Sequence, residues 1–97
     1  MRIVIRTFAD PETERVFQRL ACGRLSGDVQ RSAYRKLVLI DAAESINDLR
    51  IPPGNRLEKL EGNREGQHSI RVNEQWRICF RWKDGDAYDV EIADYHR

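Results

Sequence analysis

Three arginines stand at positions where β-strands would place them on one surface. Arg77 and Arg81 are separated by an even number of residues in the segment 75–83, and Arg71 has a matching place in the segment 67–72. Because side chains alternate between the two faces of a strand, adjacent antiparallel strands would gather the three arginines on one face. A planar guanidinium group can hold two phosphate oxygens at once through its fork of N–H donors. The arrangement therefore suits a phosphodiester ligand.

Two histidines are candidates for proton transfer near neutral pH. His96 directly follows a predicted strand that carries Tyr95 on the arginine-bearing face, beside the strand that carries Arg77. A histidine this near a chain end is more often an exposed side chain without a function, so both interpretations of His96 are open. His68 falls on the opposite face together with Ile70, and we interpret it as structural.

The distribution of charge along the chain also favours a polyanionic ligand. The formal net charge is only +1, but residues 50–83 hold eight basic and four acidic side chains, whereas residues 84–97 hold one basic and five acidic side chains. Clustered basic residues attract phosphate groups. The basic segment adds Arg56 and Lys59 to the candidate phosphate-binding residues.

The same charges allow a second interpretation, in which they neutralise one another. Asp89 and Glu91 fall on the arginine-bearing face. Each of them can pair with Arg71 or Arg81, because opposite charges on neighbouring strands commonly pair. Such pairing would leave a single arginine available for a ligand.

The elements that must position these residues begin with a strand and a helix. Residues 3–8 form a β-branched run that predicts an opening strand. Asp10-Pro11-Glu12 predicts a helix start, because Asp can cap the free amides and Pro is tolerated in the first turn. Gly23 marks the predicted end of this helix. Its apolar face consists of Val16, Phe17, Leu20 and Ala21.

A longer amphipathic helix and a set of strands are predicted to follow. The helix begins near Ser26 or Asp28 and runs to about Asn47. A loop over residues 52–55 then ends the helical pattern, and Asp84-Gly85 predicts a two-residue hairpin turn. The apolar stripe of the helix consists of Val29, Ala33, Leu37, Ile40, Ala43 and Ile46, and the predicted strands cover residues 56–60, 67–72, 75–83 and 87–95.

The period of two along the strands predicts which face meets the helices. Apolar side chains occupy one face, and this face must pack against both helices. We therefore expect a single α+β domain over residues 1–97, with an N-terminal strand and two helices packed on one face of a mainly antiparallel sheet. The core-facing residues are predicted to be Ile70, Val72, Trp76, Ile78, Phe80, Trp82, Tyr88, Val90 and Ile92.

Composition excludes several classes of protein. With 97 residues, 40% of them hydrophobic, the chain can build one modest core. No apolar run approaches the roughly 20 residues that span a bilayer, and no signal-peptide core is present. Cys22 and Cys79 lack metal-ligand spacing, so we expect reduced thiols in a cytoplasmic protein without membrane contact.

Beyond these physical patterns, the second half of the chain resembles a known family. The string NRLEKLEGNREGQHSIRVNEQWRICF and the ending VEIADYH are similar to HigB-like toxins of the RelE/ParE superfamily, the plasmid maintenance killer type of type II toxin–antitoxin systems. Weaker similarity extends forward through KLVLIDAAESINDLRIPPGN to the strand around Phe8. Either string alone would be weak, but the combination is fairly specific.

The resemblance implies a RelE-like fold and a metal-independent endoribonuclease without a cofactor. Such toxins cut mRNA in the ribosomal A site, where the RNA 2′-hydroxyl attacks the adjacent phosphate, and so they inhibit translation. They act in contact with ribosomal RNA. They are neutralised by a HigA-like helix-turn-helix antitoxin, through which alone they reach operator DNA.

The resemblance also suggests roles for individual residues. Arg77 matches the arginine that stabilises the transition state, and His96 matches the terminal general acid or base. Arg64 and Arg71 match phosphate-contacting positions. Tyr95 and Asp94 occupy the positions that adjoin the terminal histidine.

Glu58 is a departure from the family pattern. Many HigB proteins have a histidine there and a lysine three residues later, where this chain has Glu58 and Glu61. Other members of the superfamily use a glutamate at this position as the general base, and we assign that role to Glu58. The alternative, favoured by the two glutamates and the acidic last strand, is a catalytically weak or inactive module that binds the ribosome or an antitoxin–operator complex.

Overall fold

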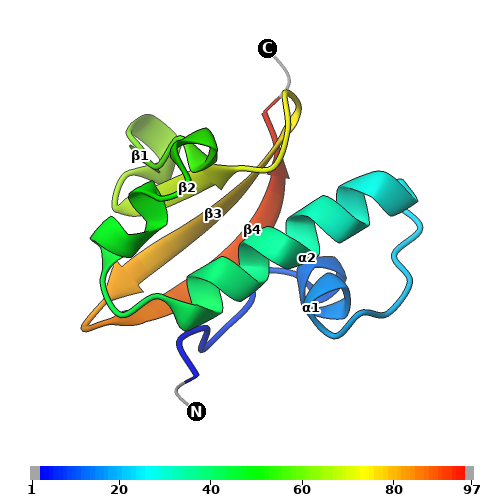
Figure 1. Cartoon of the computed structure of the whole chain (residues 1–97), viewed down its shortest axis with the longest axis horizontal. Helices are drawn as coiled ribbons and strands as arrows, with labels where there is room; N and C mark the ends of the chain where they lie inside the picture. Colours follow the sequence, from blue (N-terminus) through cyan, green and yellow to red (C-terminus); the bar gives the residue numbers. More distant parts are fainter. Residues whose placement is uncertain (1–2, 96–97) are drawn as a thin grey trace.

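Both α-helices lie against one face of a four-stranded antiparallel sheet, as Figure 1 shows. The computed structural model describes residues 3–95 of the chain. The predicted α+β class is confirmed. Neighbouring strands in the sheet are also neighbours in sequence. The elements are α1 (Pro11–Phe17), α2 (Gly27–Ala42), β1 (Glu58–Lys59), β2 (Gln67–Arg71), β3 (Trp76–Lys83) and β4 (Asp86–Asp94), with 3₁₀ turns at Ile46–Arg50, Pro53–Asn55 and Gly62–Arg64.

The N-terminal segment runs parallel to β4 without forming a regular strand. Two isolated bridges, Ile5 with Ala87 and Phe8 with Val90, join them. A bulge in β4 separates the bridges: Asp89 has a φ of +53°, and its amide donates to the Thr7 hydroxyl. The predicted strand over residues 3–8 is therefore extended but interrupted, because a bulge inserts an unpaired residue into the ladder.

Both helix starts follow the sequence signals, but both helices end earlier than predicted. The Asp10 side chain caps α1, and the Ser26 side chain caps α2. The helix end predicted at Gly23 is wrong, because the chain leaves α1 after Phe17 through Arg19, whose φ is +62°. Leu20 is consequently 47% exposed. The second helix, predicted to run to about Asn47, ends at Ala42, and residues 46–50 form a separate 3₁₀ turn.

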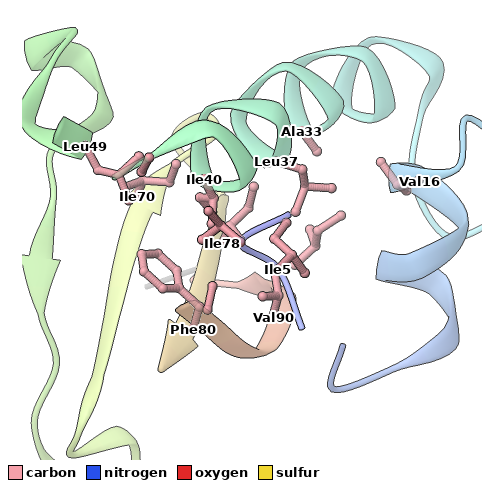
Figure 2. Close-up of a cluster of buried hydrophobic side chains, with 14 of the residues drawn as sticks. Ile5, Val16, Ala33, Leu37, Ile40, Leu49, Ile70, Ile78, Phe80 and Val90 are labelled. Carbon is pink, nitrogen blue, oxygen red and sulfur yellow. The ribbon is translucent and has the colours of Figure 1, made fainter. Parts of the chain in front are cut away.

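The core lies between α2 and the sheet, and Figure 2 shows its central side chains. Leu37 and Ile40 of α2 pack against Ile78 and Phe80 of β3, and all four are fully buried. The prediction of a core position is wrong for Tyr88. The bulge in β4 shifts the alternation, so Ala87 takes the core position and Tyr88 pairs with Arg81.

The remaining general expectations concern the turn, the cysteines and membrane contact. The Asp84-Gly85 turn is confirmed, and both residues have the positive φ that a tight hairpin requires. Cys22 and Cys79 are buried free thiols. No helix within residues 3–95 is long and apolar enough to cross a membrane.

A buried asparagine fastens the loop between α2 and β1. Asn55 is fully buried, and its amide group donates to the carbonyls of Leu49 and Ile51. Its Oδ1 accepts a hydrogen bond from Lys36 Nζ of α2. This side chain thus closes the loop on itself and ties it to the helix.

We expect Asn55→Ala to lower the free energy of unfolding by about 1–3 kcal/mol, because buried hydrogen-bonding groups lose their partner. Urea denaturation would measure the change. Asn47→Ala is the matched control, since Asn47 is exposed and its side chain accepts a hydrogen bond from Arg50, which is exposed too. Equal losses in the two variants would contradict the role of Asn55.

The interpretation of His68 as structural is consistent with its position. Its ring stacks on Phe80 with a centroid distance of 6.3 Å. Its Nδ1 is buried and finds no hydrogen-bond partner within residues 3–95. Burial lowers the pKa of His68, and the charges of Lys59 and Arg50 lower it further.

A lowered pKa predicts a loss of stability in mild acid. The unfolded chain binds a proton near the ordinary histidine pKa of about 6.5, whereas the folded chain binds it only at lower pH. The free energy of unfolding should therefore fall as the pH drops from about 6.5 toward the folded-state pKa. In His68→Phe, which keeps a ring beside Phe80, this part of the loss should vanish. Urea midpoints measured at several pH values would show it, and an unchanged slope in the variant would exclude His68 as its source.

Candidate active site

Two adjoining hollows lie on the sheet face that the helices leave open. The larger has a volume of about 620 Å³, and the smaller has a volume of about 330 Å³. Glu58 and Tyr95 line both of them. The larger is also lined by Arg71, Asn73, Glu74, Gln75 and Arg77, and the smaller by Lys59, Leu60, Glu61, Asn63 and Arg64.

Arg77 is the most deeply held cation of this face. Arg77 is only 8% exposed. Its Nε donates to Ser69 Oγ over 2.7 Å, and its Nη2 donates to the Arg56 carbonyl over 2.6 Å and to the Ser69 carbonyl over 3.3 Å. Buried charges need such partners, because an unpaired one costs several kcal/mol. The positive charge is therefore fixed in place.

Glu58 brings a carboxylate to the same hollow. It lies opposite Ser69 in the pairing of β1 with β2. Its Oε1 is 3.8 Å from Arg77 Nη2, and its side chain is 51% exposed. The carboxylate is thus close to the fixed cation and accessible to a ligand. This combination suits a base that takes a proton from a hydroxyl group beside a phosphate.

Arg71 supplies a second guanidinium group at the larger hollow. It is the cross-strand partner of Arg77 in the antiparallel ladder. No side-chain hydrogen bond or ion pair of Arg71 is found with any residue between 3 and 95. Of the three arginines expected on one face, Arg71 is the one whose donor fork is uncommitted within the described chain.

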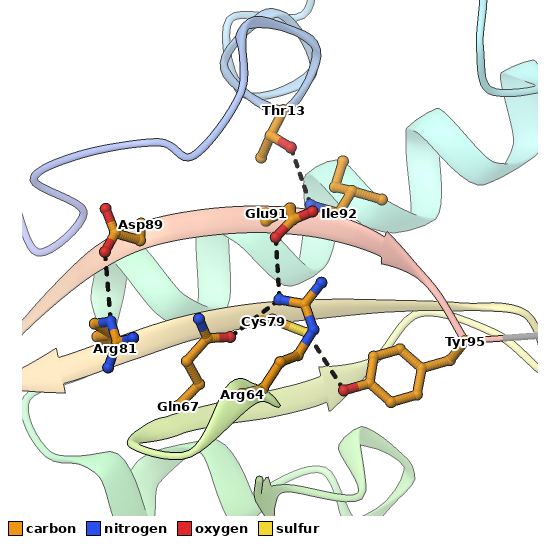
Figure 3. Close-up of polar contacts among 9 residues, drawn as sticks. All are labelled: Thr13, Arg64, Gln67, Cys79, Arg81, Asp89, Glu91, Ile92 and Tyr95. Carbon is orange, nitrogen blue, oxygen red and sulfur yellow. Dashed lines mark hydrogen bonds and ion pairs between the residues drawn. The ribbon is translucent and has the colours of Figure 1, made fainter. Parts of the chain in front are cut away.

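Arg64 is tied into a polar layer beneath the smaller hollow, which Figure 3 shows. Its Nη1 donates to Gln67 Oε1 and to Glu91 Oε1, each over 3.1 Å. The hydrogen bond that Arg64 donates to Glu91 is the main reason that the pKa of Arg64 is raised. Glu91 therefore pairs with Arg64, and neither Arg71 nor Arg81 is its partner. This pairing reduces the charge that Arg64 can offer to a phosphate.

Tyr95 and Cys79 complete this layer. The Cys79 thiol lies 3.9 Å from the Tyr95 hydroxyl. Burial raises the pKa of Tyr95 and, separately, that of Cys79. Both groups are consequently protonated at neutral pH, so Tyr95 can donate a hydrogen bond to a ligand but is no base there.

Three other predicted phosphate-binding residues do not line the larger hollow beside Arg77. Arg81 pairs with Asp89 over 3.5 Å, as one interpretation of the charges expected, and lines a different hollow. Lys59 pairs with His68 on β2 and lines only the smaller hollow. Arg56 reaches Arg77 through its backbone carbonyl, not through its side chain.

The structure describes some of the predicted site residues near the chain end. Asp94 is exposed, accepts a hydrogen bond from Gln75 and lines neither hollow. His96 lies outside the described residues. Within residues 3–95, no three side chains of His, Cys, Asp or Glu form a group that could hold a metal ion.

Ser69 has no role among the sequence-based predictions, although it shares a face of β2 with Arg71. Alternation along β2 was the available signal. No pattern in the sequence predicts the hydrogen bond from Arg77 to the Arg56 carbonyl. Arg56 adopts a left-handed backbone with a φ of +45°, which local propensity does not predict. The assembled group, a carboxylate beside a fixed guanidinium and a second uncommitted one, can deprotonate a hydroxyl and stabilise an anionic phosphorus centre.

Known proteins have sequences similar to that of this chain. The toxin HigB-1 of Vibrio cholerae serotype O1 is 48% identical over 73 residues, which cover 75% of this chain and 76% of the relative. The endoribonuclease HigB of Proteus vulgaris is 37% identical over 98 residues, which cover 96% of this chain and all of the relative.

Solved structures agree at the level of the fold. The YoeB dimer of Staphylococcus aureus matches with a TM-score of 0.61, and YoeB in the YoeB–YefM complex matches with 0.60. Each comparison covers both chains completely at 22% identity. Residues 6–96 match the family model described as the RelE-like toxin of type II toxin-antitoxin system HigB. The chain therefore belongs to the HigB family of RelE-like toxins of type II toxin–antitoxin systems.

Proposed function

We propose that this toxin is an endoribonuclease that cleaves mRNA by intramolecular transesterification. The observation that carries the proposal is the Glu58 carboxylate 3.8 Å from the Arg77 guanidinium in one accessible hollow. The relative from Proteus vulgaris, which this chain matches along its whole length, is named an endoribonuclease. A single-stranded RNA phosphate with its neighbouring ribose is the ligand that this hollow fits in charge.

The proposed reaction needs a base, a positive charge and an acid. Glu58 takes the proton of the 2′-hydroxyl while the 2′-oxygen bonds to phosphorus. Arg77 stabilises the crowded, negatively charged phosphorane. The bond from phosphorus to the 5′-oxygen then breaks, and His96 protonates the departing oxygen. The products are a 2′,3′-cyclic phosphate and a 5′-hydroxyl, and no metal ion takes part.

Other residues of the hollow bind the substrate in this proposal. Arg71 holds nonbridging phosphate oxygens through its donor fork, which has no partner within residues 3–95. The protonated Tyr95 donates a hydrogen bond to the RNA. Asp94 holds Gln75 at the end of β4 and so supports the strand that leads to His96.

The proposed setting is the ribosomal A site in the cytoplasm. Membership of a type II system favours a protein antitoxin as the inhibitory partner, and we propose a helix-turn-helix protein of the HigA kind that also contacts operator DNA. The structural neighbour YoeB is found in complex with YefM. The neighbouring reading frame would test this partner directly.

We expect Arg77→Ala to lower the rate of mRNA cleavage by about 100- to 1,000-fold, the usual effect of removing a transition-state donor. Primer extension on mRNA translated in vitro would measure the cuts. Arg31→Ala is the control, because Arg31 lies exposed on α2, where it pairs with Asp28. Undiminished cutting by Arg77→Ala and by His96→Ala would refute the catalytic assignment.

Glu58→Gln should lower the same cleavage rate by about 100- to 10,000-fold, the usual contribution of a general base. The amide keeps the size of the side chain but cannot accept the proton. Glu61→Gln, on the rim of the smaller hollow, is the matched control and should cleave at least as fast as the wild type. A rate for Glu58→Gln within twofold of the wild type would remove Glu58 as the base.

A non-cleaving binding module is the second candidate function. Two glutamates, Glu58 and Glu61, line the smaller hollow, and Glu91 neutralises Arg64 beside it. These acids weaken the attraction for RNA. Equal growth inhibition by the wild type and His96→Ala, with no cuts in mRNA, would establish this second function in place of the first.

A further inference from the structure

Arg77 has few donors left for a substrate. Its Nε–H is taken by Ser69 Oγ, and its Nη2 is shared between the carbonyls of Arg56 and Ser69. Within residues 3–95, no partner of Nη1 is found. The guanidinium therefore presents one nitrogen to the hollow, in place of the two-pronged fork that the sequence predicts.

Two of these three anchors are backbone carbonyls, and the third is the Ser69 hydroxyl. Ser69 is fully buried. It stands between Glu58 on β1 and Cys79 on β3 in the ladder. Its hydroxyl accepts the hydrogen bond from Nε, the atom that joins the guanidinium to the aliphatic part of the side chain. Fixing Nε restricts rotation of the whole planar group.

We propose that Ser69 is a positioning residue that orients Arg77 for the phosphorane. This inference rests on the proposed ribonuclease function and deepens it. Without the hydroxyl, Arg77 keeps its two backbone anchors but loses the one at Nε, and its plane can turn about the Nη2 contacts. A displacement of about 1 Å at a reacting centre can lower a rate on the order of 100-fold.

The fold offers a matched control for this proposal. Thr13 of α1 is another fully buried residue whose hydroxyl accepts a hydrogen bond, in its case from the Ile92 amide. Thr13 lies beside Ile92 (Figure 3), on the helix that packs against β4, and it lines neither hollow. Ser69→Ala and Thr13→Val each remove one buried acceptor and leave one donor unpaired. They should lower the urea midpoint of unfolding to a similar degree.

The experiment combines kinetics with a spectroscopic measurement on the full chain. Single-turnover cleavage of ribosome-bound mRNA would be measured for the wild type, Ser69→Ala, Thr13→Val, Arg77→Ala and the double variant Ser69→Ala/Arg77→Ala. Solvent exchange of the Arg77 Nε–H would be followed by ¹⁵N NMR, with the signal assigned by its absence in Arg77→Ala. If Ser69→Ala is poorly folded, Ser69→Cys, which keeps a side chain of similar size but only a weak acceptor, replaces it.

The expected result separates positioning from stability. Ser69→Ala should lower the cleavage rate constant about 10- to 100-fold, while the concentration for half-saturation stays within about twofold of the wild-type value. Thr13→Val should leave both quantities unchanged. In the Arg77→Ala background, Ser69→Ala should cost nothing further, because residues acting as a unit are not additive. The Nε–H should exchange slowly in the wild type and in Thr13→Val, and fast in Ser69→Ala.

Three results would overturn the inference. The first is a cleavage rate in Ser69→Ala equal to that of Thr13→Val. The second is a loss of rate on adding Ser69→Ala to Arg77→Ala that equals the loss on adding it to the wild type. The third is unchanged exchange of the Nε–H in Ser69→Ala. A wild-type protein that does not cleave would instead overturn the proposed function. The exchange measurement would then still decide whether Ser69 holds Arg77.

Discussion

A buried guanidinium group must have its donors satisfied, and Arg77 imposes this constraint on the open face of the sheet. Its charge lies beneath the surface, on β3, which is paired with β2 on one side and β4 on the other. Backbone carbonyls and one hydroxyl surround it. Leaving such a charge without partners would cost several kcal/mol, which is a large part of the stability of a domain this size.

The position of the loop before β1 follows from the same constraint. The carbonyl of Arg56 can point at Arg77 because Arg56 adopts a left-handed backbone conformation. The preceding residue, Asn55, fixes that loop from inside, with hydrogen bonds to the carbonyls of Leu49 and Ile51 and from Lys36. A chain of polar contacts thus links α2, on one face of the sheet, to the hollow on the other.

The open face is a second small core as well as a surface. Leu60, Cys79 and Ala93 are buried there, and Tyr95 packs against them. Arg64 closes this cluster through its ion pair with Glu91. The arginines predicted to bind phosphate consequently differ in whether an acidic side chain pairs with them. Arg64 and Arg81 are paired with acids, whereas Arg71 has no such partner in residues 3–95, which supports its proposed role as a phosphate ligand of the hollow.

Sequence by itself determined the α+β class, the helix starts at Asp10 and Ser26, the Asp84-Gly85 hairpin and the faces of β2 and β3. These features depend on local preferences and on side-chain alternation, which neighbouring residues specify. It failed at Tyr88 and at the helix ends, where a bulge and a left-handed residue interrupt the local pattern. Only the tertiary structure decided which donors of Arg77 are available to a ligand. Glu58, Ser69 and the Arg56 carbonyl come from separate segments, and their approach to Arg77 depends on the register of three strands and on one strained residue, which local preferences along the chain do not specify.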